Sequence, residues 1–273
     1  MPKLCPMCDR GIVSMRKTVF LAFVVGLLSS LSVANAAIVQ DFEGAFTDPA
    51  GTWQVDRFAP AVFASGSVGG GRNGVLTHSI SSADLQGTAF YNTQGRKFDL
   101  GPGTDTLSVE LFVDDDWASL AAGTRLAGLW GTAVDAVDAV AGYPIIEFII
   151  ETTGNGLFRG YDSSGGSWVD ILAVTDFGSG NWYDLEIALV GNEFTYSVNG
   201  TIGATVGAGS TTEITNAILQ GHNAGANYSI YWDNLAASPV AASAVPEPAS
   251  LALLAVGAVG LVAGARRRRK TAC

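Results

Sequence analysis

The sequence predicts an all-β protein: one antiparallel sandwich of two sheets, of the jelly-roll type. Residues 37–245 contain several runs in which apolar and polar side chains alternate with the two-residue period of a half-buried strand. Turn sequences rich in Gly, Asn and Asp separate these runs at short intervals. A segment of about 200 residues is also long enough to bury one hydrophobic core.

The expected strands are, in chain order, residues 107–113, 145–150, 182–189, 193–198 and 201–206. Asn199-Gly200 separates the last two strands and is a strong hairpin signal, because both residues readily adopt positive φ. Only residues 134–140 are a candidate for a short helix.

The N-terminus has the pattern of a secretory signal peptide. Met15-Arg16-Lys17 is basic, residues 19–31 are apolar, and Ala34-Asn35-Ala36 has the small-x-small form of a cleavage site. This order predicts a signal peptide over 1–36 that is removed after Ala36.

The C-terminus has the pattern of a membrane span. Residues 249–265 carry no charge and are followed by four arginines and a lysine. At 1.5 Å per residue such a helix is about 25 Å long, near the lower limit for crossing a bilayer. The basic tail, residues 266–273, is expected to stay in the cytoplasm, so the remaining chain lies outside.

These patterns divide the chain into five expected parts. They are a signal peptide (1–36), a β-sandwich domain (37–240), a linker with a Pro-Glu-Pro motif (241–248), a transmembrane helix (249–265) and a basic tail (266–273).

The exported segment is strongly acidic. Residues 37–245 hold six basic and 23 acidic side chains, a formal charge of −17. This balance argues against binding nucleic acid or an anionic membrane surface, since both require basic patches. Cys5, Cys8 and Cys273 all lie in the terminal segments, so no disulfide is expected in the sandwich.

Val245-Pro246-Glu247-Pro248, followed by an apolar span and an arginine cluster, resembles the PEP-CTERM sorting signal of exopolysaccharide-producing Gram-negative bacteria. The resemblance implies export by the secretion translocon and processing by an exosortase near Pro-Glu-Pro. It also implies delivery to the cell surface or extracellular matrix, where exopolysaccharide is an expected partner. The two prolines keep this segment extended and accessible to a processing enzyme.

The sandwich segment is similar to the concanavalin-like and laminin-G-like jelly rolls. Three stretches carry the similarity: IVQDFEG at 38–44, WYDLEIALVGNEFTYSVNGT at 182–201, and YSIYWDNL at 228–235. The resemblance implies glycan binding in many relatives and glycan hydrolysis in some, and the fold alone does not decide between them.

The carboxylates favour the non-catalytic alternative. Laminarinase-type enzymes of this fold carry Glu-x-Asp-x-x-Glu, whereas this chain has Glu147 and Glu151 without an intervening Asp. On a regular strand these two lie about 13 Å apart, farther than the roughly 5–9.5 Å of catalytic pairs. We therefore expect solvated carboxylates and no enzyme. The alternative is a polysaccharide hydrolase, or a lyase that uses His222 with Tyr228 or Tyr231.

Six tryptophans lie in the exported segment, and most are expected in the core. Trp117 and Trp168 stand beside polar or Gly-rich loops and are the candidate rings for stacking on sugars. No tandem repeat is present.

The resemblance also implies a metal. Related carbohydrate-binding modules hold a structural Ca²⁺ with an early acidic residue and a late Asp, and Glu43 and Asp233 occupy such positions. Ca²⁺ takes carboxylate and carbonyl oxygens, and it would offset part of the negative charge. Asp114-Asp115-Asp116, and the pair Asp135 and Asp138, are expected to be solvated turns instead.

Overall fold

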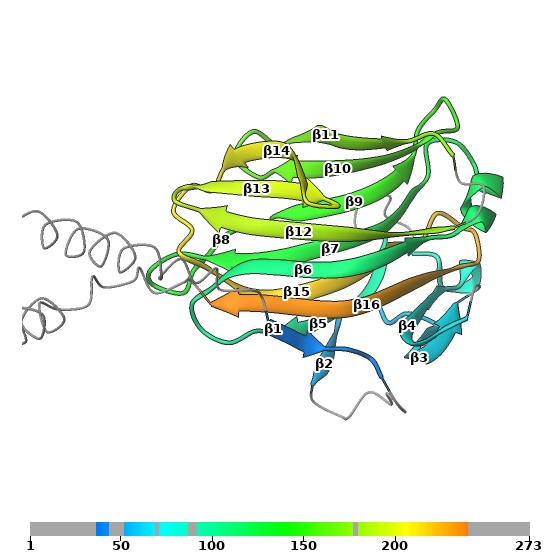
Figure 1. The fold of residues 1–273 in the computed structure, drawn as a ribbon, viewed down its shortest axis with the longest axis horizontal. Coiled ribbons are helices and arrows are strands. Elements are labelled where there is room, and N and C mark those ends of the chain that lie inside the picture. The colour runs from blue at the N-terminus through cyan, green and yellow to red at the C-terminus, as the bar shows by residue number, and fades with distance from the viewer. Residues whose placement is uncertain (1–36, 44–51, 69–70, 87–91, 177–179, 240–273) are drawn as a thin grey trace, which may run out of the picture. The chain divides into compact units, whose positions relative to one another are not determined.

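A computed structural model describes residues 37–43, 52–68, 71–86, 92–176 and 180–239 (Figure 1). Within these residues the strands form two sheets of eight that face each other across one core. All named strand pairs are antiparallel, so the predicted two-sheet antiparallel sandwich is confirmed. None of the helices in this part of the chain is both long and apolar enough to span a membrane.

Sheet A has the order β14-β13-β12-β6-β16-β4-β3, and β1 pairs with β16 beside this path. Its strands are β1 (Ala37–Gln40), β3 (Val62–Val68), β4 (Arg72–Ile80), β6 (Thr104–Val113), β12 (Asn181–Val190), β13 (Glu193–Val198), β14 (Thr201–Gly207) and β16 (Tyr228–Pro239).

Sheet B has the order β11-β10-β9-β7-β15-β5-β2, with β8 paired to β7. Its strands are β2 (Trp53–Arg57), β5 (Thr93–Asp99), β7 (Arg125–Val134), β8 (Val140–Gly142), β9 (Ile145–Ile150), β10 (Gly156–Asp162), β11 (Ser167–Val174) and β15 (Glu213–His222). Two short 3-10 helices, η1 (Ser82–Asp84) and η2 (Asp115–Ser119), connect the sheets.

The predicted alternation sets which side chains enter the core. Leu185 and Ile187 of β12 are fully buried, and each pairs directly with a buried residue of β13, Val198 and Tyr196 respectively. The Asn199-Gly200 hairpin is confirmed: both residues have positive φ, 52° and 71°. The local two-residue period therefore fixed the inner face of these strands.

The expected helix over 134–140 is wrong. β7 runs to Val134, and the chain then turns and begins β8 at Val140. The carboxylate of Asp135 accepts hydrogen bonds from the backbone N–H groups of Val137 and Ala139, each at 3.0 Å. Asp138 has a φ of 61°. A side chain that bonds its own backbone in this way favours a turn over a helix.

The first and last strands lie side by side. Ala37 pairs with Ala237, and Ile38 pairs with Ala236. The early residue Glu43 therefore follows a strand that pairs with β16, the strand that carries Asp233. The predicted signal peptide with its cleavage site at Ala36, the motif Val245–Pro248 and the expected membrane helix lie outside the described residues.

Candidate functional site

The outer face of sheet B, which points away from sheet A, carries a group of aromatic and basic side chains. Leu129 and Phe148 point into the core, while the adjacent Trp130 and Glu147 belong to this outer face. Direct strand pairing places its residues in two rows that cross the strands. The aromatic row consists of Lys97, Ile218, Trp130, Ile145, Tyr161 and Trp168. The charged row consists of Asp56, Gly95, Gln220, Gly128, Glu147, Arg159 and Asp170.

Trp168 ends the aromatic row on β11 and is partly exposed. Its ring centre lies 5.0 Å from that of Tyr161, with the two planes tilted by 52°. The guanidinium carbon of Arg159 lies 4.2 Å from the ring centre, close enough for a cation–π interaction. The predicted ligand residue Trp168 thus lies on the surface, within a group of aromatic and cationic side chains.

Trp130 lies farther along the same row and is only 3% exposed. The guanidinium carbon of Arg57 is 4.9 Å from its ring centre. Arg57 is the last residue of β2 and has a positive φ of 54°. This conformation places the guanidinium of Arg57 over Trp130, in the middle of the aromatic row.

Glu147 lies between two arginines. Arg159 donates to its carboxylate from Nε (2.9 Å) and from Nη2. Arg125 donates from Nε (3.1 Å to each oxygen) and from Nη2 (2.7 Å). Glu147 is 4% exposed, so the expectation of a solvated carboxylate is wrong for this residue. Burial requires such pairing, because an unpaired carboxylate is strongly disfavoured away from water.

This pairing bears on catalysis at the outer face of sheet B. Within the two rows the acidic side chains are Asp56, Glu147 and Asp170. Glu147 and Asp170 stand two strands apart, about 10 Å by strand spacing, with Arg159 between them. Both oxygens of Glu147 already accept hydrogen bonds from guanidinium groups, so a substrate would have to displace these arginines to reach them.

Trp117 is not on the surface. It is 1% exposed, and its indole N–H donates to the carbonyl of Ser229 at 3.1 Å. Its ring packs 5.5 Å from that of Phe148. The expectation of an open stacking ring is therefore wrong for Trp117, because η2 turns this side chain inward although its sequence neighbours are polar.

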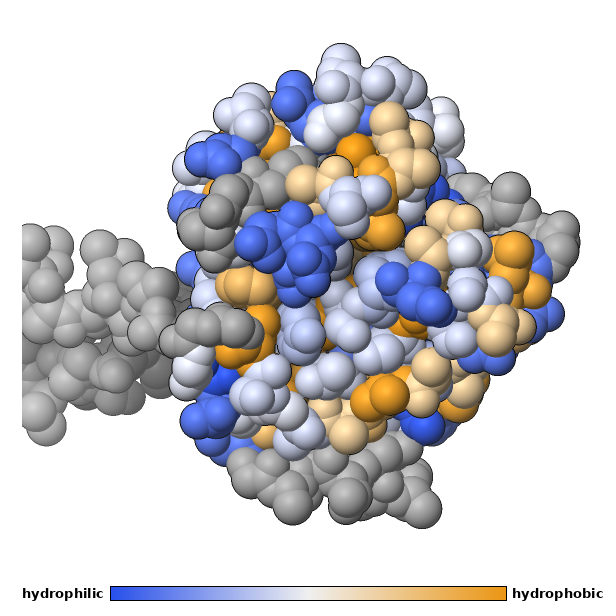
Figure 2. All heavy atoms as spheres, turned by 90° about the vertical axis from the view of Figure 1, so that its right-hand side faces the viewer, coloured by the Kyte–Doolittle hydropathy of each residue, from blue (hydrophilic) through white to orange (hydrophobic). Residues whose placement is uncertain are grey.

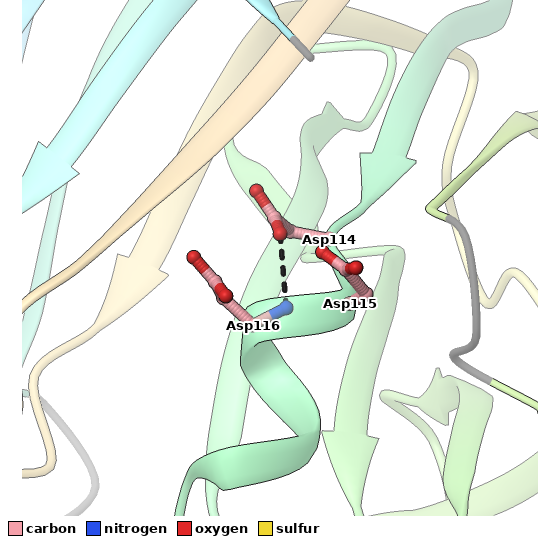
Figure 3. Close-up of side chains that lie close together, drawn as sticks. All are labelled: Asp114, Asp115 and Asp116. Carbon is pink, nitrogen blue, oxygen red and sulfur yellow. Dashed lines mark hydrogen bonds between the residues drawn. The ribbon is translucent and has the colours of Figure 1, made fainter. Parts of the chain in front are cut away.

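The three aspartates before Trp117 form an acidic turn in which Asp115 and Asp116 are exposed and Asp114 is half-buried (Figure 3). Their carboxylate oxygens lie within 4.8 Å of one another, and Asp114 accepts a 3.0 Å hydrogen bond from the N–H of Asp116. Burial raises the pKa of Asp114, and its two acidic neighbours add to this rise. A groove of about 410 Å³ lies beside the turn.

At the end of the sandwich nearest β3 and β4, hydrophilic and hydrophobic patches alternate over the described residues (Figure 2).

The outer face of sheet A holds a row of three carboxylates in direct register: Asp233, Glu110 and Asp184. Arg72 pairs with Asp233 and Glu110 through the same nitrogen. Burial raises the pKa of Asp184, and the nearby Glu110 carboxylate raises it further. Burial also raises the pKa of Asp233. A groove of about 420 Å³ runs along Glu110 and Asp184.

Glu43 and Asp233, the expected metal ligands, are both at sheet A. The carboxylate of Glu43 lies over Gly74, which has a positive φ of 74°, at the place that a Cβ atom of this residue would take. Gly74 is two residues before Leu76, the residue that pairs with Trp232. Carboxylate oxygens are ligands that suit a hard cation such as Ca²⁺, but both oxygens of Asp233 already have partners, the N–H of Asn234 and Arg72.

The tyrosines considered for lyase chemistry are not directed at the imidazole of His222. The Tyr228 hydroxyl donates to the backbone carbonyl of His222 at 2.7 Å, and burial raises the pKa of this phenol. Tyr231 packs against Phe112 on the outer face of sheet A.

Comparisons with known proteins give separate results for the C-terminal motif and for the β-sandwich. The PEP-CTERM protein-sorting motif matches residues 244–269, so the sorting motif predicted at Val245–Pro248 is confirmed. Such a motif implies export and a C-terminal tail that is anchored in the membrane before exosortase cleavage. No curated protein sequence matches the chain significantly.

The sandwich resembles solved glycoside hydrolases in fold. SCLam, a non-specific endo-β-1,3(4)-glucanase from family GH16, is 13% identical with a TM-score of 0.50, over 75% of this chain and 91% of that one. The catalytic domain of an endo-1,3-β-glucanase (laminarinase) from Thermotoga petrophila RKU-1 is 12% identical with a TM-score of 0.49, over 74% and 97%. A sialidase is 10% identical with a TM-score of 0.43, over 70% of this chain and 17% of its own. The likeness to SCLam supports a jelly-roll fold for the two-sheet sandwich.

Proposed function

We propose that this protein is an exported, exosortase-processed component of the cell surface or extracellular matrix that binds glycans without catalysis. The ligand lies on the outer face of sheet B and stacks on Trp168. The observation that carries the proposal is the partly exposed Trp168 ring beside Tyr161 and Arg159. An aromatic ring beside hydrogen-bond donors offers an apolar sugar face and its hydroxyls their complementary surfaces.

The experiment is a glycan array probed with the full-length chain in detergent. Trp168→Ala should weaken binding about tenfold or more, as expected for the loss of an anchoring aromatic residue. Trp182→Ala is the matched control, because Arg72 lies 4.1 Å from the centre of that ring on the outer face of sheet A. Undiminished binding by Trp168→Ala, or an equal loss in both variants, would contradict the site.

The second candidate is a polysaccharide hydrolase. The fold resemblance to glucanases and the carboxylate row on sheet A, in which burial and Glu110 raise the pKa of Asp184, favour it. A raised pKa is what a general acid requires. A reducing-sugar assay with the wild type and Asp184→Asn separates the two: release of sugar by the wild type and its loss in the variant would replace the binding proposal.

A further inference from the structure

We infer that the ligand of the outer face of sheet B is an acidic polysaccharide: a linear polymer of carboxylated sugars that lies across the strands along the aromatic row. This inference rests on the proposed function and adds the charge class of the glycan.

The first argument is the placement of the basic residues. Residues 37–245 contain only six, and four of them, Arg57, Lys97, Arg125 and Arg159, lie on this one face. The same face holds four carboxylates, those of Asp56, Asp99, Glu147 and Asp170, so these charges cancel there in a segment whose formal charge is −17. Asp99 lies at the next outward position along β5 and accepts a hydrogen bond from Asn216.

The second argument is that Glu147 and Asp56 are engaged, whereas cationic donors remain beside them; Asp170 is exposed and forms no ion pair in the part of the chain that the structure describes. Glu147 accepts from both Arg125 and Arg159, and Asp56 pairs with Arg57 at 3.2 Å. Within the described residues Lys97 forms no ion pair, and the Nη1 group of Arg159 has no acceptor. These donors are available to a carboxylated ligand, and guanidinium–carboxylate hydrogen bonds are among the strong ones.

The third argument is spacing. Cations stand at one end, in the middle and at the other end of the aromatic row: Lys97 on β5, Arg57 over Trp130, and Arg159 over Trp168. Five strand spacings separate β5 from β11, about 24 Å in all. A polymer crossing the sheet would meet the rings of Tyr161 and Trp168 at one end. Farther along it would meet the positive charges of Arg57 and Lys97, because Trp130 is itself only 3% exposed.

The acidic remainder of the domain does not oppose this binding strongly. At physiological ionic strength the screening length is about 8 Å. The carboxylates of sheet A lie beyond a core about 10 Å thick, so contacts with the nearby cations dominate.

The test measures binding of polygalacturonate and alginate, and of the same polymers after carboxyl reduction. The full-length chain is used in detergent, with Arg266, Arg267, Arg268, Arg269 and Lys270 replaced by Gln in every protein so that the basic tail does not bind the polyanion. We expect a carboxylated polymer to bind at least tenfold tighter than its reduced form in 50 mM salt, and several-fold more weakly in 500 mM salt. Lys97→Gln should weaken binding about two- to fivefold, and Trp168→Ala about tenfold or more.

Asn192→Asp is the matched control, because it changes the net charge as Lys97→Gln does but lies in the β12–β13 turn of sheet A. An equal loss in both variants would mean that binding follows overall charge, and the inference would be wrong. Trp168-dependent binding that does not distinguish the reduced polymers would overturn the inference and leave the proposed function standing. Absence of binding to all four polymers and to the array would overturn both.

Discussion

The Nε group of Arg159 donates a 2.9 Å hydrogen bond to the carboxylate of Glu147. Arg125 holds the same carboxylate from the opposite side, so one buried charge connects the neighbouring strands β7, β9 and β10. The guanidinium of Arg159 also covers the Trp168 ring. Glu147 therefore positions a surface cation, although it is itself only 4% exposed.

Glu147→Gln keeps the shape of the side chain and removes its charge. Two guanidinium groups would then lose their counter-charge, and we expect a loss of about 3 kcal/mol in the free energy of unfolding. Urea unfolding measures this loss. The control is Glu186→Gln, an exposed carboxylate on β12, which should change the free energy by about 0.5 kcal/mol or less. Wild-type stability of Glu147→Gln would refute the structural role assigned to Glu147.

The strands of the sandwich could be predicted because their signal is local. Leu185 and Ile187 follow a two-residue period, and Asn199-Gly200 marks the turn by its own chemistry. The partners of Glu147 could not be predicted in this way. Arg125 and Arg159 lie 22 and 12 residues away in the sequence, and only the order and register of three strands bring them together.

The direction of side chains outside the strands was the second feature that could not be predicted from the sequence. Trp117 follows three aspartates, which favours an exposed turn, but a single turn of 3-10 helix points the indole into the core. Trp168, which also stands beside polar residues, is partly exposed and packs against a hydrophobic cluster. Its neighbours Arg159 and Tyr161 gave no local signal, since they lie on the preceding strand and face it only through the β10–β11 register.

His78 is a buried residue with a pH-dependent effect on stability. Its Nε2 lies 2.9 Å from the carbonyl of Gln94, and its Nδ1 accepts from the indole N–H of Trp232 at 3.4 Å. Burial lowers the pKa of His78 to about 3. The folded protein therefore keeps this imidazole neutral at pH values where the unfolded chain protonates it.

The direction of the pH effect on stability follows from the difference in the pKa of His78 between the folded and unfolded states. Below pH 6.5 the unfolded state binds a proton that the folded state does not, so the stability contributed by neutral His78 falls as the pH decreases toward about 3. The slope approaches about 1.4 kcal/mol per pH unit. His78→Gln, which offers both a donor and an acceptor, should lose this slope between pH 6.5 and 5, measured by urea unfolding. His222→Gln should retain it. Equal pH dependence in the wild type and His78→Gln would contradict the assignment.

Removal of the signal peptide and of the C-terminal segment would lower the mass of the mature protein, and this change can be measured. The sorting motif at 244–269 and the signal-peptide pattern lead us to expect a mature protein that lacks residues 1–36 and the segment after Pro248. Intact-mass analysis of surface material measures both ends. Replacing Pro246 and Pro248 by Ala should retain the tail, because the extended segment read by the processing enzyme is lost. An arginine tail on the wild-type surface protein would refute this prediction.

Ca²⁺ should stabilise the domain through Glu43 and Asp233. Glu43 lies over Gly74 near the end of β1, and Asp233 is 4% exposed on the paired strand β16. Arg72 is the cation that Asp233 contacts, so a bound metal has to displace or share that ion pair. A ligand that binds only the folded state adds about 2.7 kcal/mol at a hundredfold excess over Kd.

For a domain of this size, that free energy corresponds to a rise in Tm of about 5–10 °C. Thermal melts in Ca²⁺, Mg²⁺ and chelator measure it, with Asp233→Asn beside the wild type and Asp170→Asn as the exposed control. A specific site should respond to Ca²⁺ well above Mg²⁺, because Mg²⁺ requires a tighter octahedral arrangement and gives up its water reluctantly. If the ions acted only by diffuse screening of the acidic surface, Ca²⁺ and Mg²⁺ would instead raise the Tm by nearly the same amount. Equal shifts in Ca²⁺ and Mg²⁺, or a full Ca²⁺ shift in Asp233→Asn, would therefore exclude the site.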